Sequence, residues 1–194
     1  MAQLPPYPKQ LGLFTQFIAQ RPEALALKEK VMSLSGDSFD IKLANGQPIF
    51  QVKGETFSLS GRKHFCDMSG NELFTIRKKL IALHTTFYAE DTTGNVLFEV
   101  KSKFSIGGTK MICTFKDETL MVKGNFFDTT AQITDEATKQ PVAVIDRKFF
   151  NAREMFSGQD TYAVSVAPNV DMALVAAMCI CMDEKKEEAK SYAS

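Results

Sequence analysis

Histidine is scarce in this sequence, and the two histidines, His64 and His84, both lie in runs typical of β-strands. Neither a G-x-S-x-G sequence nor a Cys/His signature accompanies them. A catalytic site needs a nucleophile beside a base, a metal cluster or a cofactor fingerprint, and the sequence offers none of these patterns. We therefore predict a protein that is not an enzyme and that binds no cofactor and no metal.

Cysteine is also sparse, with four residues, Cys66, Cys113, Cys179 and Cys181, irregularly spaced in apolar sequence. This usage is typical of buried, reduced thiols in an intracellular protein. The first residues carry neither a secretory signal pattern nor, with Ala2, a myristoylation site. We expect a cytoplasmic location, with the membrane surface and the nucleus left open.

Excess charge of either sign is missing, because 23 basic side chains balance 23 acidic ones. The sequence therefore gives no reason to expect a nucleic acid partner. The balance is uneven along the chain, since residues 53–123 carry eleven basic and eight acidic side chains, and residues 124–194 carry seven and eleven. An anion-binding surface is expected from the middle third of the chain.

One long hydrophobic run stands out, from Met172 to Met182, eleven residues without a polar side chain between Asp171 and Asp183. Its Ala, Leu and Met residues favour a helix, and Asn169 and Asp171 provide N-cap chemistry, so we predict a helix over residues 169–183. At ~1.5 Å per residue the run covers about 16 Å, roughly half of a ~30 Å hydrocarbon core. A helix that is apolar on all sides must then be enclosed by the protein itself.

Three glycines, Gly46, Gly70 and Gly94, follow one another at intervals of 24 residues, and each opens a similar octet. The octets read G-Q-P-I-F-Q-V-K, G-N-E-L-F-T-I-R and G-N-V-L-F-E-V-K, and a more distant copy begins at Lys139. A β-rich run precedes each octet, and Asn-Gly, Ser-Gly and Thr-Gly turns join the two in the first three copies. The repeat unit is therefore predicted to be a β-hairpin, used four times.

Side chains of a strand alternate between its two faces, so each octet has an inward and an outward set. The apolar set is predicted to face inward: Phe50, Val52, Phe74, Ile76, Phe98 and Val100. The polar set is predicted to face the solvent: Gln51, Lys53, Thr75, Arg77, Glu99 and Lys101.

Further strands are predicted at residues 110–115, 119–123 and 161–166, and a strand pair or one long strand at 24–34, which gives eleven to thirteen strands in all. About eleven or twelve strands can enclose a helix of ~10 Å diameter. The sequence thus predicts a mainly β protein, a closed or nearly closed antiparallel barrel around the C-terminal helix.

Basic residues give the sharpest functional signal, because they gather at the ends of the second and third octets and just before the second. The candidate lipid- or anion-binding residues are Arg62, Lys63, Arg77, Lys78, Lys79, Lys101 and Lys103. If neighbouring hairpins pair in order, these residues could converge into a patch for phosphates. The alternative is that they only solubilise the outer face of the barrel.

Two stretches carry a resemblance to a known family: R-K-K-L-I-A-L-H at residues 77–84 and D-T-Y-A-V-S-V-A-P-N-V-D-M-A-L-V at residues 160–175. Together with the repeated hairpins, they resemble the LURP-one-related family of the tubby C-terminal-like group, to which phospholipid scramblases are related. The resemblance implies a twelve-stranded antiparallel barrel around a central hydrophobic helix. We expect an arm at residues 1–22, the barrel domain at 23–184 and a solvated tail at 185–194.

The resemblance implies two functions of different kinds, since tubby domains are phosphoinositide-binding membrane tethers and LURP-one-related proteins are linked to defence and stress signalling. The first is a module that binds a phosphoinositide headgroup or an anionic membrane surface. The second is an interaction scaffold for an unknown protein partner, without lipid binding. A scramblase-like activity is disfavoured, because the multi-cysteine cluster is absent and residues 160–171 are poor in carboxylates. We expect a monomer.

Overall fold

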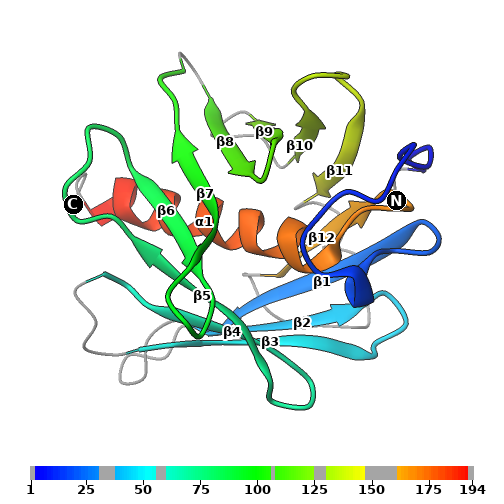
Figure 1. Cartoon of the computed structure of the whole chain (residues 1–194), viewed down its shortest axis with the longest axis horizontal. Helices are drawn as coiled ribbons and strands as arrows, with labels where there is room; N and C mark the ends of the chain where they lie inside the picture. Colours follow the sequence, from blue (N-terminus) through cyan, green and yellow to red (C-terminus); the bar gives the residue numbers. More distant parts are fainter. Residues whose placement is uncertain are drawn as a thin grey trace.

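The computed structural model describes residues 3–30, 38–55, 60–105, 108–124, 130–146 and 161–191. Within these residues, twelve strands surround one long helix, α1 (Met172–Ser191), and a short 3-10 helix, η1 (Thr15–Phe17), lies near the N-terminus (Figure 1). The strands are β1 (Glu23–Lys30), β2 (Ser38–Leu43), β3 (Pro48–Gly54), β4 (Lys63–Asp67), β5 (Glu72–Lys78), β6 (Thr86–Glu90), β7 (Val96–Ser102), β8 (Thr109–Phe115), β9 (Glu118–Gly124), β10 (Thr130–Asp135), β11 (Pro141–Asp146) and β12 (Thr161–Val166).

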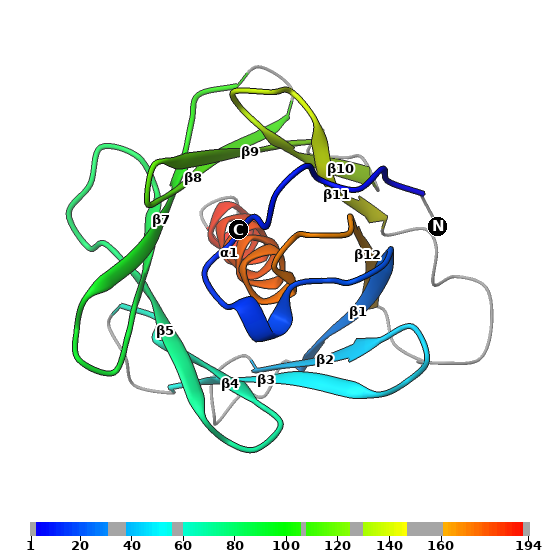
Figure 2. The same cartoon turned by 45° about the vertical axis from the view of Figure 1, so that its right-hand side comes forward.

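The strands form a closed antiparallel barrel, in which each strand pairs with the next and β1 closes the ring against β12. Figure 2 shows α1 inside this ring. The prediction of a twelve-stranded antiparallel barrel around a C-terminal helix is therefore confirmed. Closure leaves every one of these strands paired on both sides, so the barrel has no free sheet edge.

The four predicted hairpins are β2–β3, β4–β5, β6–β7 and β10–β11. Gly46, Gly70 and Gly94 have φ angles of 86°, 85° and 88°, in the left-handed region that glycine adopts without steric cost. The spacing of 24 residues therefore marks a recurring tight turn.

The inward set of the octets is buried as predicted, and the phenylalanines form one aromatic cluster. The ring centroids of Phe65 and Phe74 lie 4.6 Å apart, and those of Phe74 and Phe98 lie 5.4 Å apart. Of the outward set, Gln51 and Lys53 are exposed. Thr75 departs from the pattern, because its hydroxyl donates a hydrogen bond to Glu72 (2.6 Å) and only 6% of the residue is exposed.

Helix α1 begins later than predicted, at Met172, because Asn169 has a φ of 70° that no right-handed helix accommodates. Asp171 caps the helix, since its Oδ1 accepts a hydrogen bond from the backbone N–H of Ala173 (2.9 Å). From Ala173 to Met182, no residue is more than 2% exposed. The predicted enclosure of the apolar run is confirmed.

The helix also ends later than the predicted boundary at residue 183, and residues 185–191 of the expected tail are helical. Glu184 and Glu188 explain the extension, because they form ion pairs with Lys63 (3.0 Å) and Lys78 (2.6 Å) on the barrel rim. Residues 192–194 lie outside the described residues.

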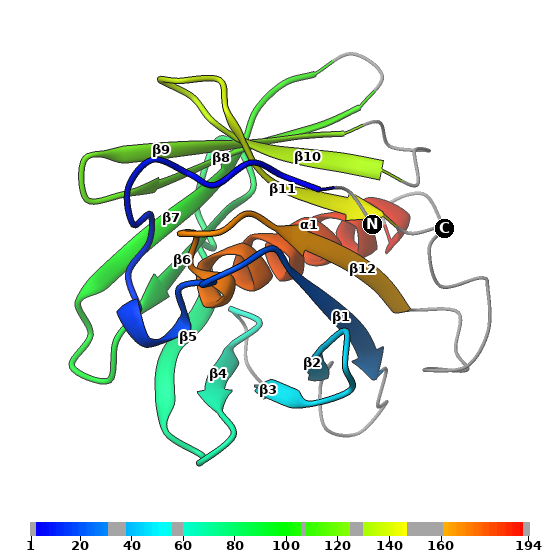
Figure 3. The same ribbon diagram turned by 90° about the vertical axis from the view of Figure 1, so that its right-hand side faces the viewer.

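The N-terminal arm, residues 3–22, crosses the end of the barrel where α1 begins, which we call the arm end (Figures 2 and 3). Tyr7 and Leu11 of the arm are buried, so the arm packs on the domain. The backbone N–H groups of Leu13 and Phe14 each donate to Oδ2 of Asp171 at 2.9 Å. One carboxylate therefore holds both the arm and the first turn of the helix.

The opposite end of the barrel, where α1 leaves it, is called the exit end (Figure 3). Strands β5, β7 and β9 end there, and β6, β8 and β10 begin there. The β5–β6 connection, residues 79–85, therefore shares the exit end with the last turns of α1.

The cysteines are free thiols, and three of them, Cys113, Cys179 and Cys181, are buried. Burial raises the pKa of the Cys113 and Cys181 thiols, which keeps them protonated and unreactive. Cys66 is only half-buried, unlike the prediction for all four.

Candidate anion-binding site

The basic residues predicted to bind anions divide into two groups, according to whether a glutamate is within ion-pair distance. Five are paired in the structure: Arg62 with Glu55, Lys63 with Glu184, Arg77 with Glu90, Lys78 with Glu188 and Lys79 with Glu99. The other two, Lys101 and Lys103, are half-buried and exposed respectively, at the end of β7.

Lys63 is unsuited to bind an external ligand, because its side chain is only 6% exposed. Its ammonium group contacts Glu184 and lies 5.8 Å from the centre of the Phe39 ring. The alternation of β4 explains this orientation, since Lys63 is in phase with the buried Phe65. Lys63 holds the helix inside the barrel and lies away from the outer surface.

Arg77 and Lys79 do lie together on the outer face, with the guanidinium of Arg77 5.8 Å and the ammonium of Lys79 6.0 Å from the centre of the Tyr88 ring. The Arg77 guanidinium donates to Oε1 of Glu90 at 2.7 Å, and Lys79 pairs with Glu99. The hydrogen bond to Glu90 raises the pKa of Arg77. Their positive charge is therefore largely balanced, and an anion would have to displace a glutamate to reach either side chain.

A second group of basic side chains crosses β7, β8 and β9. The sequence-based prediction captured only part of this group. The backbone N–H of Lys103 donates to the carbonyl of Lys110 (2.9 Å), and Lys110 is the cross-strand partner of Lys123. Lys101 lies two residues before Lys103 and so projects from the same face. We call Lys101, Lys103, Lys110 and Lys123 the lysine row.

The lysine row faces outward, because the residues beside its members, Ser102, Met111 and Val122, are buried. Side chains directly opposite each other in antiparallel strands have Cβ atoms ~5 Å apart, and like charges at that distance destabilise a sheet. No carboxylate of the described residues lies within the 4.0 Å ion-pair distance of any lysine of the row. Among the described residues, the row is thus a cluster of positive charge without a carboxylate partner.

Lys110 and Lys123 are missing from the sequence-based prediction, although a signal for them exists. The short turn Lys116-Asp117-Glu118 between two predicted strands implies a tight hairpin, and counting back along both strands pairs residue 110 with residue 123.

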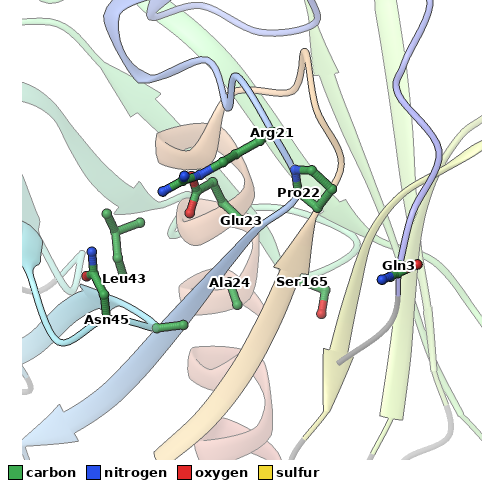
Figure 4. Close-up of a pocket in the computed structure, with 9 residues that line it drawn as sticks. Gln3, Arg21, Pro22, Glu23, Ala24, Leu43, Asn45 and Ser165 are labelled. Atoms are coloured by element: carbon green, nitrogen blue, oxygen red, sulfur yellow. The ribbon is translucent and has the colours of Figure 1, made fainter.

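A hollow of about 340 Å³ lies near the arm end, between the arm, β1, the β2–β3 turn and β12 (Figure 4). The guanidinium of Arg21 on its rim pairs with Glu23 (2.9 Å), and Ser165 lines the wall from β12. The opposite charges on the rim balance each other, so this hollow offers an anion less than the lysine row does.

Among the described residues, His64 forms a titratable cluster with two glutamates. Its Nδ1 lies 3.0 Å from Glu72 and its Nε2 lies 2.8 Å from Glu55. Burial alone lowers the pKa of His64, but the hydrogen bonds to the two glutamates outweigh it and raise the pKa above the ordinary value. This arrangement on β4 is an ion-pair network, and the Thr75 hydroxyl also lies 3.0 Å from Nδ1 of His64.

Comparison with protein families supplies the assignment that geometry alone does not give. A family model described as LURP-one-related matches residues 23–183, most of the chain. The chain belongs to the LURP-one-related family. The matched span starts at the first residue of β1 and ends within α1, so it covers the barrel and the buried part of the helix.

Two relatives of the chain are proteins of Arabidopsis thaliana. The protein LURP-one-related 15 is 27% identical over 192 residues, covering 91% of this chain and 86% of its own length. Protein LURP1 is 27% identical over 186 residues, covering 88% and 87%. An X-ray structure of an Arabidopsis thaliana protein superposes with a TM-score of 0.62 at 24% identity, covering 87% of this chain and 94% of that one, and shows the same fold.

Helix α1 cannot act as a membrane span. Among the described residues, no helix combines the length and the apolar character that crossing a bilayer requires.

Proposed function

We propose that this LURP-one-related protein is a non-enzymatic module that binds the phosphorylated headgroups of phosphoinositides at a membrane surface, and that the lysine row is the contact site. One observation carries the proposal: four lysines from three adjacent strands face outward, and no described carboxylate is paired with them. A multiply phosphorylated ring presents several anionic oxygens at the spacing of neighbouring strands.

The expected strength of this contact follows from the number of charges. A lysine close to an anionic surface contributes about 1 kcal/mol, so four lysines supply about 4 kcal/mol, which corresponds to roughly millimolar affinity. The interaction is screened by salt, because the lysines are at the surface. Headgroup binding through the row alone is therefore weak, and a stable membrane contact needs a second source of energy.

Arg77 and Lys79, the two paired cations of the outer face, contribute less to phosphate binding than their positions in the sequence suggest. Arg77 and Lys79 must give up Glu90 and Glu99 before they bind a phosphate, and this exchange cancels most of the gain. Variants of the lysine row are therefore the sharper test, and Arg77→Gln is expected to weaken binding less than Lys110→Gln.

The test is sedimentation with phosphatidylcholine vesicles that contain or lack phosphoinositide, at low and at high salt. The variant Lys103→Gln/Lys110→Gln/Lys123→Gln removes three charges of the row, so it should lower affinity by about 3 kcal/mol, more than a hundredfold. The matched control, Lys9→Gln/Lys116→Gln/Lys139→Gln, removes three exposed charges at the arm end and should bind as wild type does. Circular dichroism checks that each variant is folded.

Two outcomes would contradict the proposal. One is wild-type binding no stronger than to plain phosphatidylcholine, and the other is equal loss of binding in the row variant and in its control. The first outcome would favour a protein-interaction scaffold without lipid binding, and the second would mean that overall charge, and not the lysine row, carries the binding.

A further inference from the structure

Four large apolar side chains are strongly exposed in two connections of the barrel. Leu80, Ile81 and Leu83 lie between β5 and β6 and are 65%, 98% and 94% exposed, and Phe104 follows β7 and is 82% exposed. Single exposed apolar residues are common on protein surfaces, but a contiguous group marks an interaction site. We call these four residues the apolar tip.

The two connections are neighbours in space. The backbone N–H of Ser102, at the end of β7, donates to the carbonyl of Thr85 in the β5–β6 connection (2.9 Å). Both connections belong to the exit end, and in Figure 1 the β5–β6 connection lies beside the end of α1. The ion pair between Lys78 and Glu188 fixes the base of that connection to the helix.

Basic residues border the apolar tip on the side of the barrel. Lys79 directly precedes Leu80, Lys103 directly precedes Phe104, and the rest of the lysine row continues from there across β8 and β9. Apolar side chains at the tip and cations just behind them match the layers of an anionic bilayer, in which hydrocarbon lies beneath a negatively charged headgroup region.

We infer that the apolar tip inserts into the outer part of an anionic bilayer while the lysine row contacts the headgroups, so that the exit end faces the membrane. This inference rests on the proposed function and deepens it. It supplies the second source of energy that the weak charge contact requires, because each inserted side chain leaves water. Insertion to ~5–10 Å, the depth typical of interfacial segments, is within reach of side chains at loop tips.

The chain contains no tryptophan, so a single introduced tryptophan reports its own surroundings. Ile81→Trp places the reporter at the tip, and Val96→Trp, at a residue 61% exposed in the β6–β7 hairpin at the arm end, is the matched control. The probes are vesicles of phosphatidylcholine with phosphatidylserine and phosphoinositide, in which the phosphatidylcholine acyl chains are brominated or plain. Insertion predicts a blue shift and bromine quenching at position 81 and neither at position 96.

A second variant tests the same contact by affinity. Ile81→Ser/Leu83→Ser should bind the vesicles at least tenfold more weakly than wild type, yet bind a soluble inositol polyphosphate as well as wild type does, because the lysine row is intact. The matched control is Met68→Ser/Val96→Ser, with two exposed apolar residues at the arm end, which should bind both probes normally.

The outcomes separate the two proposals. Vesicle binding by wild type without quenching at position 81, or with full affinity of the Ile81→Ser/Leu83→Ser variant, overturns insertion and leaves headgroup binding standing. Absence of wild-type binding to both vesicles and inositol polyphosphate overturns both. Binding of the soluble polyphosphate without vesicle binding also overturns insertion and identifies a free phosphorylated ligand.

Discussion

The two ends of the barrel differ in how far the chain covers their apolar surface. At the arm end, residues 3–22 fold back over the opening, and Tyr7 and Leu11 are at most 2% exposed. At the exit end, Ile81 and Leu83 are each more than 90% exposed. The same barrel thus has one end closed by its own chain and one end that presents apolar groups to the outside.

The two ends also differ in the pairing of their charged groups. At the arm end, the Asp171 carboxylate accepts four backbone hydrogen bonds and is buried with them. At the exit end, the lysine row has no carboxylate partner among the described residues. Satisfied polar groups and buried apolar groups are typical of a structural end, and the opposite combination indicates the end that meets a partner.

The largest expected effect comes from placing the same carboxylate at two sites, one on the enclosed helix and one in the exposed β5–β6 connection. Ala176→Asp introduces a carboxylate at a position that is 0% exposed and completely surrounded, which costs several kcal/mol out of a total stability of ~5–15 kcal/mol. The protein should not fold. Ala82→Asp, the same change on an exposed residue of the β5–β6 connection, should unfold in urea at nearly the wild-type concentration. A folded Ala176→Asp protein would contradict the enclosure.

A smaller effect is expected from breaking the closure of the arm end. Asp171→Ala removes the helix cap and leaves the part-buried amides of Leu13 and Phe14 and the buried amide of Ala173 without their acceptor, so we expect a loss of about 2–4 kcal/mol. Urea unfolding measures the loss, and proteolysis within residues 3–22 should quicken. The control is Asp91→Ala, whose carboxylate also accepts turn amides but is solvated, so the loss should be clearly smaller. Equal losses would mean that the arm end gains nothing from burial of this carboxylate.

The smallest effect is a pH dependence that arises from His64. Its pKa is raised in the folded protein, so the stabilisation is complete below the unfolded pKa of ~6.5 and is lost as the pH rises through the folded pKa. Unfolding free energies should therefore fall by about 1 kcal/mol or less between pH 6 and pH 8, and His64→Gln should remove this part of the dependence. The expectation fails if both proteins show the same pH profile.

Much of the fold could be predicted from the sequence, because periodicity is local. The interval between Gly46, Gly70 and Gly94 predicts repeated hairpins, and the alternation around Phe50, Phe74 and Phe98 predicts the buried face. Thr75 was the exception, because its burial depends on Glu72 and His64 folding over it from the same hairpin.

The candidate site was less predictable, because charge compensation acts through space. Lys63 and Lys78 look like surface cations next to Arg62 and Arg77, yet strand alternation turns them toward α1. The alternation can be read from the sequence. The positions of Glu184 and Glu188 beside these lysines cannot, because the glutamates follow more than a hundred residues later and only the fold brings them close.

The sequence by itself determined which segments must be buried and which face of each strand is apolar, since these follow from side-chain chemistry at fixed spacing. Only the tertiary structure decided where α1 ends, which cations are neutralised and which lysines remain unpaired. The physical reason is that an ion pair depends on the distance between two charges and on the water around them, and closure of the barrel sets both. Ring order brings Lys103, Lys110 and Lys123 together on three adjacent strands, and brings Leu80 and Phe104 to the same end.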